Sequence, residues 1–218
     1  MASMWSAGSQ RVVGATLAVV LSLASSLASS LPTAQPQRAA QPLPPGGRGG
    51  GRGRGAIQVM TLTSTAFADG GQIPSLYTQA GEQASPPLQW ANVPDGVVSF
   101  VIVVHDPDAA IGNGTDDLLH WLLWNIPGSE TRLEASMPHG PELPGGIRQI
   151  SATGPFYRGP GAAAAGPAHH YVFELFALDT MLDVPPVGVS PAQTRAAVMS
   201  AMAGHVRGKA AYIGQFKR

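Results

Sequence analysis

Residues 101–108 read V-I-V-V-H-D-P-D. Four β-branched apolar residues in a row predict a buried strand. Because a proline and two carboxylates disrupt ladder pairing, we expect the strand to end at the histidine and to leave Asp106 and Asp108 at its tip. After a turn-rich loop, a second apolar strand is predicted for residues 118–124. This strand returns His120 towards the same two carboxylates. We therefore expect the functional site at these strand ends.

Further strands and one helix are predicted on both sides of this pair. Alternating or continuous apolar residues predict strands at residues 57–62, 97–104, 171–178 and 211–216. Ser190 as N-cap, followed by proline at the first helical position, predicts a helix that continues over residues 192–203. Residues 130–167, rich in glycine and proline, predict an ordered functional loop or a partly mobile one. The predicted fold class is mostly β and antiparallel, with one or two peripheral helices.

The N-terminal residues differ in composition from the rest of the chain. An apolar run over residues 12–27 follows an arginine and precedes small residues, so residues 1–34 are predicted to be a secretory signal peptide. Retention of this segment as a membrane anchor is the alternative. Residues 35–56 are rich in glycine, proline and arginine, which predicts a disordered linker. The folded domain is then residues 57–218, and the predicted location is the periplasm or the extracellular space, with no stable membrane span after cleavage.

Composition and charge exclude several classes of function. The chain of 218 residues has no cysteine, so disulfides, thiolate metal sites and a cysteine nucleophile are excluded. Five of its 13 basic residues and none of its 13 acidic ones precede residue 56, which leaves the predicted domain with eight basic and 13 acidic residues. A net negative domain gives no electrostatic reason to bind nucleic acid. No cofactor is predicted.

Polar groups at the predicted strand ends suggest three kinds of site: Asp106, Asp108, His120, His169 and Tyr171. A metal site is weakly indicated, because no His-x-His or H-E-x-x-H pattern is present. A hydrolase using acyl transfer lacks a G-x-S-x-G nucleophile motif. An anion pocket requires only hydrogen-bond donors. Imidazole and phenol groups can donate to the oxygens of an anion, and the backbone amides of Gly159 and Gly161 are predicted to form a nest for the same ligand oxygens.

The remaining notable side chains are predicted to be structural. His105, His139, His170 and His205 are interpreted as ordinary structural histidines. Glu174, Asp179 and Asp183 are interpreted as solvated charges at strand ends. The tryptophans are expected in the core: Trp90, Trp121 and Trp124.

Four motifs together resemble the phosphatidylethanolamine-binding protein family, and in particular its bacterial Raf-kinase-inhibitor-like branch. They are H-D-P-D-A from residue 105, H-W from residue 120, G-P-G from residue 159 and H-H-Y-V-F from residue 169. The resemblance implies a Greek-key β-sandwich-like core of two sheets and a small anion pocket. It also implies that Asp106, His120, His169 and Tyr171 line that pocket, with Asp108 beside them. The sequence departs from the family pattern where prolines and an arginine are replaced, at Ala110, Ala162, Ala163 and His170.

The predicted function is a non-catalytic binding protein for phosphate-bearing or carboxylate small molecules, or for phospholipid headgroups. Two alternatives remain: a metal-assisted or His/Asp acid–base hydrolase using the same residues, and a modulator of an exported protein partner such as a protease. Since side chains alternate along a strand, His169 and Tyr171 are expected to face the pocket and His170 to face away.

Overall fold

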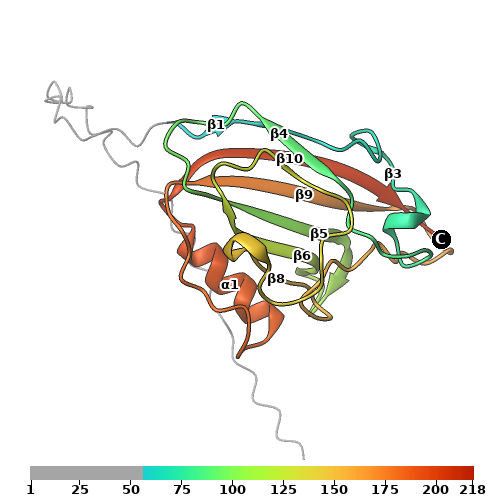
Figure 1. Ribbon diagram of the computed structural model, residues 1–218. Coiled ribbons are helices and arrows are strands. Elements are labelled where there is room, and N and C mark those ends of the chain that lie inside the picture. Colours follow the sequence, from blue (N-terminus) through green and yellow to red (C-terminus); the bar gives the residue numbers. More distant parts are fainter. Residues whose placement is uncertain (1–55) are drawn as a thin grey trace, which may run out of the picture. The chain divides into compact units, whose positions relative to one another are not determined.

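The computed structural model describes residues 56–218 and shows a β-rich domain with a single α-helix (Figure 1). Its elements, with two short 3₁₀ turns, are β1 (Gln58–Val59), β2 (Thr61–Thr63), β3 (Gly71–Gln72), η1 (Ser75–Tyr77), β4 (Leu88–Ala91), β5 (Ser99–Ile111), β6 (Asp116–Pro127), β7 (Arg132–Leu133), η2 (Pro144–Gly146), β8 (Arg148–Ile150), β9 (His169–Leu178), α1 (Pro191–Ala201) and β10 (Val206–Phe216).

The strands form two sheets. The larger sheet has the order β1-β10-β9-β5-β6-β8, with β3 also paired to β10, and the smaller has the order β2-β4-β7. The long central strands pair antiparallel, whereas β1 and β3 run parallel to β10. The mostly β class with one helix is therefore confirmed, although the sheet is not purely antiparallel. These pairings do not establish the predicted Greek-key connection.

The two faces of the large sheet bury different partners. One face packs against the small sheet and includes Phe100, Ile102, Val104, Phe173, Leu175 and, from the small sheet, Leu62, Leu88 and Trp90. The other face packs against α1 and includes Val101, Val103, Phe176, Leu178 and, from the helix, Val198. Neighbouring residues of β5 and β9 thus alternate between the two cores, as strand geometry requires. The three tryptophans predicted to be core residues are buried in these clusters.

The strand that begins in the V-I-V-V run does not end at the histidine. β5 continues to Ile111, with Asp106 opposite Leu118 and Ile111 opposite Asp116. The predicted strand end is wrong because the ladder is interrupted and then resumes: its register shifts between Asp106 and Ile111. Pro107 lies inside this irregular stretch, where a missing amide donor costs no ladder hydrogen bond.

Other predicted elements are refined by the structure. The strand expected at residues 57–62 is split, because the buried Met60 separates β1 in the large sheet from β2 in the small one. The predicted loop 130–167 contains β7, η2 and β8. The helix is confirmed: Ser190 accepts from the amide of Gln193, whose side chain in turn accepts from the Ser190 amide.

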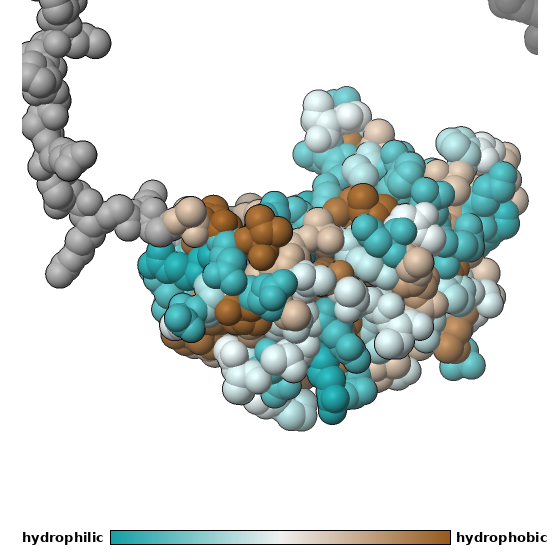
Figure 2. Space-filling view, turned by 90° about the horizontal axis from the view of Figure 1, so that it is seen from above, coloured by the Kyte–Doolittle hydropathy of each residue, from teal (hydrophilic) through white to brown (hydrophobic). Residues whose placement is uncertain are grey.

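The surface of the domain is mainly polar, with apolar groups gathered in places on the face seen in Figure 2. Ile57 and Val59, at the first edge strand, are 57% and 84% exposed. The predicted signal peptide (1–34) and linker (35–56, apart from Ala56) lie outside the described residues and stay predictions. Among residues 56–218, no helix is both long and apolar enough to cross a membrane.

Candidate functional site

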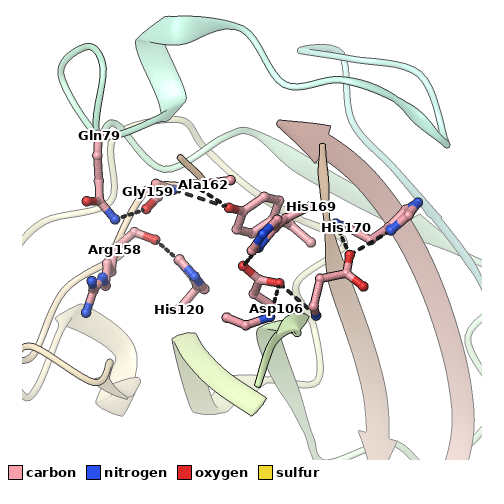
Figure 3. Close-up of polar contacts among 12 residues, drawn as sticks. Gln79, Asp106, His120, Arg158, Gly159, Ala162, His169 and His170 are labelled. Atoms are coloured by element: carbon pink, nitrogen blue, oxygen red, sulfur yellow. Dashed lines mark hydrogen bonds and ion pairs between the residues drawn. The ribbon is translucent and has the colours of Figure 1, made fainter. Parts of the chain in front are cut away.

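A small cavity of about 210 Å³ lies where β5, β6 and β9 meet the loop that precedes β9 (Figure 3). It is lined by Gln79, Asp106, Ala109, Leu118, His120, Arg158, Gly161, Ala162, Ala163, His169 and Tyr171. The four side chains predicted to be pocket residues thus surround one space, although they come from three strands. Each is held there by a different feature of the backbone.

Asp106 is fixed by three hydrogen-bond donors. Its side chain is almost wholly buried, with 2% of the residue exposed. One carboxylate oxygen accepts from the amides of Asp108 and Ala109, at 2.9 and 3.0 Å, and the other lies 2.9 Å from Nδ1 of His169. The irregular stretch of β5 that follows Asp106 supplies both amides. The carboxylate is therefore a rigid negative group at the wall of the cavity.

His169 turns its second nitrogen towards the cavity. Because the Asp106 oxygen accepts, Nδ1 of His169 carries the hydrogen of this 2.9 Å bond. The carboxylate thereby fixes the tautomer and the orientation of the ring. When the ring is neutral, Nε2 presents a lone pair; it donates only after the ring has gained a second proton.

His120 faces the cavity because of a β-bulge. Val104 is opposite Trp121 and His105 is opposite Leu119, so His120 is the extra residue of β6 between these two pairs. A bulge of this kind changes the alternation of side chains, and it places His120 on the cavity face together with Trp121. No sequence pattern around residue 120 indicated this extra residue.

The buried ring of His120 has one nitrogen bound and one nitrogen without a partner. Nδ1 lies 2.8 Å from the carbonyl oxygen of Arg158, which can only accept, so Nδ1 carries a hydrogen. Nε2 is buried and has no hydrogen-bond partner within residues 56–218. Burial lowers the pKa of His120, outweighing the hydrogen bond to Arg158 and the charge of Asp106. At neutral pH this nitrogen therefore presents a lone pair.

Tyr171 places its hydroxyl group at the cavity, next to Asp106. Its oxygen accepts from the backbone amides of Gly161 and Ala162, both at 3.2 Å, and its ring stands edge-on to that of His120. Burial, and then the negative charge of Asp106, raises the pKa of Tyr171 to about 12, so the phenol keeps its proton. With both amides directed at its oxygen, the phenol can donate its own hydrogen to the Asp106 carboxylate.

The predicted amide nest of Gly159 and Gly161 is corrected by these contacts. The Gly161 amide donates to Tyr171, and the Gly159 carbonyl accepts from the side chain of Gln79 at 2.8 Å. Gly159 does not line the cavity; it is needed because a Cβ there would lie 2.8 Å from the carbonyl carbon of Thr78. The glycines therefore shape the rim and position the phenol.

Asp108 and His170 form a pair outside the cavity. An oxygen of Asp108 accepts from the His170 amide at 2.7 Å and lies 2.8 Å from Nδ1 of its ring. Both side chains are exposed, and neither lines the cavity. His169 lines the cavity and His170 does not, which agrees with the expected alternation along the strand. Asp108 adjoins Asp106 through its amide, but its carboxylate binds His170 and does not line the cavity.

Two lining residues, Gln79 and Arg158, were not predicted. Arg158 directly precedes the quoted G-P-G motif, so its position was available from the sequence. Gln79 lies 80 residues from Gly159, its hydrogen-bond partner, and has no local signal. Only the packing of distant segments reveals it.

Glu174 is not the solvated charge that the sequence suggested. It lies on the opposite face of β9 from the cavity, 2.8 Å from Nζ of Lys209 and 3.5 Å from Nε2 of His105. The contact with His105, together with Lys209, lowers the pKa of Glu174 to about 2 against the cost of burial. His105 also contacts Asp117, so this histidine belongs to a charge network beneath α1.

The described residues contain no group of three histidine or acidic side chains placed to hold a metal ion. The lining of the cavity also lacks serine, threonine, lysine and cysteine. Its polar side chains are two imidazoles, one carboxylate, one phenol, the amide of Gln79 and the guanidinium of Arg158. Groups of these types can form hydrogen bonds with a small polar molecule and exchange protons with it.

Comparison with known proteins assigns the family. The family model described as phosphatidylethanolamine-binding protein matches residues 63–217, and the chain belongs to this family. A protein of Methanothermobacter thermautotrophicus, named UPF0098 protein, is 40% identical over 161 residues, which cover 73% of this chain and 99% of the relative. A Mycobacterium tuberculosis protein with the lipoprotein name LppC is 34% identical over 153 residues, covering 70% of this chain and 71% of the relative.

Solved structures agree with this assignment. A phosphatidylethanolamine-binding protein homologue of Chlamydia trachomatis, CT736, has a TM-score of 0.60 and 28% identity, covering 74% of this chain and 99% of its own. YbcL of E. coli has a TM-score of 0.60 and 25% identity, covering 73% of this chain and 98% of its own. None of these four names describes an enzyme.

Proposed function

We propose that this protein binds a small phosphate- or carboxylate-bearing group in the Asp106 cavity, without turnover, and takes up protons as it does so. The observation that carries the proposal is the buried Nε2 of His120, which has no partner among the described residues and belongs to a ring that lines the cavity beside Tyr171. A buried polar atom without a partner is costly, and a ligand that satisfies it gains that energy.

The size of the cavity favours a headgroup rather than a whole lipid. Its volume of about 210 Å³ is below the roughly 300–1,000 Å³ of clefts that hold drug-sized molecules. A phosphate or a carboxylate fits this scale. Inorganic phosphate, a phosphomonoester and a phospholipid headgroup share the same chemistry.

Proton uptake follows from the hydrogen-bond directions in the cavity. Both imidazoles use their Nδ1 hydrogen on protein oxygens, so in the neutral state both Nε2 atoms accept, and Asp106 adds a negative charge. A dianion would meet acceptors on three sides, and the lining contains one arginine, Arg158. Hydrogens on the imidazoles or on the ligand oxygens therefore strengthen binding. Affinity is expected to fall as pH rises above neutrality.

Calorimetric titration of the full chain tests the proposal. Phosphate, phosphoethanolamine and acetate are titrated at pH 6 and pH 8, in buffers of different ionisation enthalpy, so that protons taken up per ligand are counted. We expect net proton uptake for phosphate at pH 8 and tighter binding at pH 6. Saturable binding without proton uptake, or tighter binding at pH 8, would contradict the assignment of the tautomers.

His120→Asn is the matched variant for this test. An asparagine amide reproduces the Nδ1 donor to Arg158 but lacks the second nitrogen. We expect stability to stay close to that of the parent while phosphate affinity falls about tenfold, which is the loss of one charge-assisted hydrogen bond. Unchanged affinity would show that Nε2 does not meet the ligand.

One feature of the cavity favours the hydrolase alternative and one does not. The Asp106–His169 pair is arranged as a base with an orienting group, but no serine, threonine, cysteine or lysine lines the cavity as a nucleophile for that base to activate. Incubation with a phosphomonoester, with and without added divalent metal, separates the two functions. Sustained phosphate release that His169→Ala abolishes would overturn the binding function.

Export is the second part of the proposal. The name of the mycobacterial relative contains the word lipoprotein, and residues 1–34 are predicted to be a signal peptide. We therefore place the protein in the periplasm or outside the cell, which cell fractionation checks. A role as modulator of an exported partner, such as a protease, has only the family resemblance behind it, and a pull-down from envelope extract tests it.

A further inference from the structure

A second and larger hollow lies on the other face of the β5–β6 hairpin, between the hairpin and α1. Its volume is about 640 Å³, against about 210 Å³ for the Asp106 cavity. This volume falls within the range of roughly 300–1,000 Å³ for small-molecule sites. Figure 1 shows α1 running beside β6 and β8. We call this hollow the helix groove.

The walls of the helix groove are mainly apolar. β6 contributes Leu118 and Leu119, and α1 contributes Ala192, Ala196 and Met199. The three helix residues are spaced by four and three positions, so they lie on one face of α1. Met199 is 41% exposed. An apolar surface that faces water in this way favours an apolar ligand.

The positive groups at the groove are already engaged. Both terminal nitrogens of Arg195 bind the carboxylate of Asp117, one of them at 3.2 Å. The N-terminus of α1 is closed by the reciprocal bonds between Ser190 and Gln193. Neither positive feature is therefore free to hold an anion.

One negative group remains at the rim. Asp116 lines the groove, is exposed, and makes no ion pair with any residue in the range 56–218. Its neighbour Asp117 is neutralised by Arg195. The groove consequently combines apolar walls with a single uncompensated carboxylate.

We propose that the helix groove binds a small amphipathic cation, with its ammonium group next to Asp116 and its hydrocarbon chain between β6 and α1. The apolar walls provide affinity for the chain, and the carboxylate selects the sign of the charge. An anion with the same hydrocarbon chain is repelled by Asp116. An uncharged molecule with that chain lacks the electrostatic contribution to its binding free energy. This site is distinct from the Asp106 cavity, although Leu118 lines both.

Three eight-carbon probes that differ only in charge test the proposal: octylammonium, octanol and octanoate. Each is titrated into the isotopically labelled full chain below its micellar concentration, and amide shifts are followed by NMR. We expect saturable shifts at residues 111–119 and 190–199, with octylammonium binding two- to fivefold more tightly than octanol and octanoate weaker than both. Equal binding of all three probes, or saturable shifts confined to other residues, would overturn the proposal.

Two pairs of variants sharpen the test. Ala196→Trp fills the groove, whereas Ala197→Trp adds the same side chain at an exposed helix position outside it. We expect the first to lower octylammonium affinity at least tenfold and the second to leave it unchanged. Asp116→Asn should lower octylammonium affinity to that of octanol, while Asp95→Asn, an exposed residue elsewhere, should have no effect.

His169→Ala separates this site from the proposed anion site. It should weaken phosphate binding and leave octylammonium binding unchanged. Loss of octylammonium binding in this variant, or no loss in Ala196→Trp, would show that the cation does not occupy the helix groove. If the protein bound no phosphate but bound octylammonium as expected, the proposed anion site would be wrong and the helix-groove proposal would be supported.

Discussion

The two faces of β5 carry similar side chains that differ in whether their charges are compensated. His105 and Asp106 are consecutive residues, so they point to opposite faces of the large sheet. On the face covered by α1, His105 lies between Asp117 and Glu174. On the other face, the only side chain that forms an ion pair with Asp106 among the described residues is His169, and Asp106 lines a cavity.

On the helix face, each carboxylate has a cation of its own. Arg195 binds Asp117, and Lys209 lies 2.8 Å from Glu174, so His105 is enclosed by two ion pairs. Burial lowers the pKa of His105, but the two carboxylates outweigh it and the pKa is raised. This network links α1 to the large sheet through Asp117 of β6.

On the cavity face, no lysine or arginine forms an ion pair with Asp106 in the described residues. Among the described residues, Nε2 of His105 and Nε2 of His120 both lack a hydrogen-bond partner, but Nε2 of His105 lies 3.5 Å from a carboxylate oxygen of Glu174, whereas His120 forms no ion pair. The comparison teaches that a histidine beside a carboxylate does not mark a site. What distinguishes the cavity face is an unpartnered nitrogen that no carboxylate compensates.

The largest expected effect tests the cavity face. His169→Ala should cost on the order of 1–3 kcal/mol of phosphate affinity, the range for losing a charge-assisted hydrogen bond. His170→Ala, its immediate neighbour, should be nearly silent because its ring lies outside the cavity against Asp108. Calorimetry with phosphate at pH 6 measures both. Equal losses of phosphate affinity in the two variants would show that His169 and His170 do not lie on different faces of β9 with respect to the ligand.

The next effect tests the helix face. Asp117→Ala removes the shared partner of Arg195 and His105, and we expect it to lower the free energy of unfolding by about 1–2 kcal/mol, since the pair is only partly buried. Asp116→Ala is the matched control and should change stability by less than about 0.5 kcal/mol. Urea unfolding measures both. A stable Asp117→Ala variant would mean that the network does not fasten α1.

A smaller effect concerns pH. The folded-state pKa of His105 is raised, so its contribution to stability is complete below its ordinary pKa, near 6.5, and is lost as pH rises through the raised value. Glu174 behaves oppositely: with its pKa lowered from 4.5 to about 2, its contribution is present above pH 4.5 and is lost as pH falls towards 2. Unfolding at pH 6 and pH 8 should show a decline that His105→Gln removes. If His105→Gln showed the same decline in unfolding free energy between pH 6 and pH 8, the decline would belong to another titrating group.

The smallest effect lies outside the comparison of the two faces. Deletion of residues 35–55 should leave the melting temperature unchanged, because a segment so rich in glycine and proline has little apolar surface to bury. Thermal unfolding of the full chain and of the deletion variant checks this. A decrease of several degrees would show that these residues stabilise the domain.

The sequence by itself determined the features that depend on short-range geometry. Alternation along a strand separates His169 and Tyr171 from His170, and the spacing of Ser190 and Gln193 sets the start of α1. Both follow from backbone periodicity and from hydrogen bonds within four residues. The sequence also identified Asp106 and His120 as pocket residues, through the family resemblance.

Only the tertiary structure decided which atoms of those residues are free. The bulge that turns His120 into the cavity comes from the register of β5 against β6, and the tautomers are set by Arg158 and Asp106, which lie 38 and 63 residues from their histidine partners. The amide of Gly161, predicted to bind an anion, is used by Tyr171. Hydrogen-bond partners across a sheet depend on strand register and bulges, which distant contacts fix, so no local pattern in this chain specifies them.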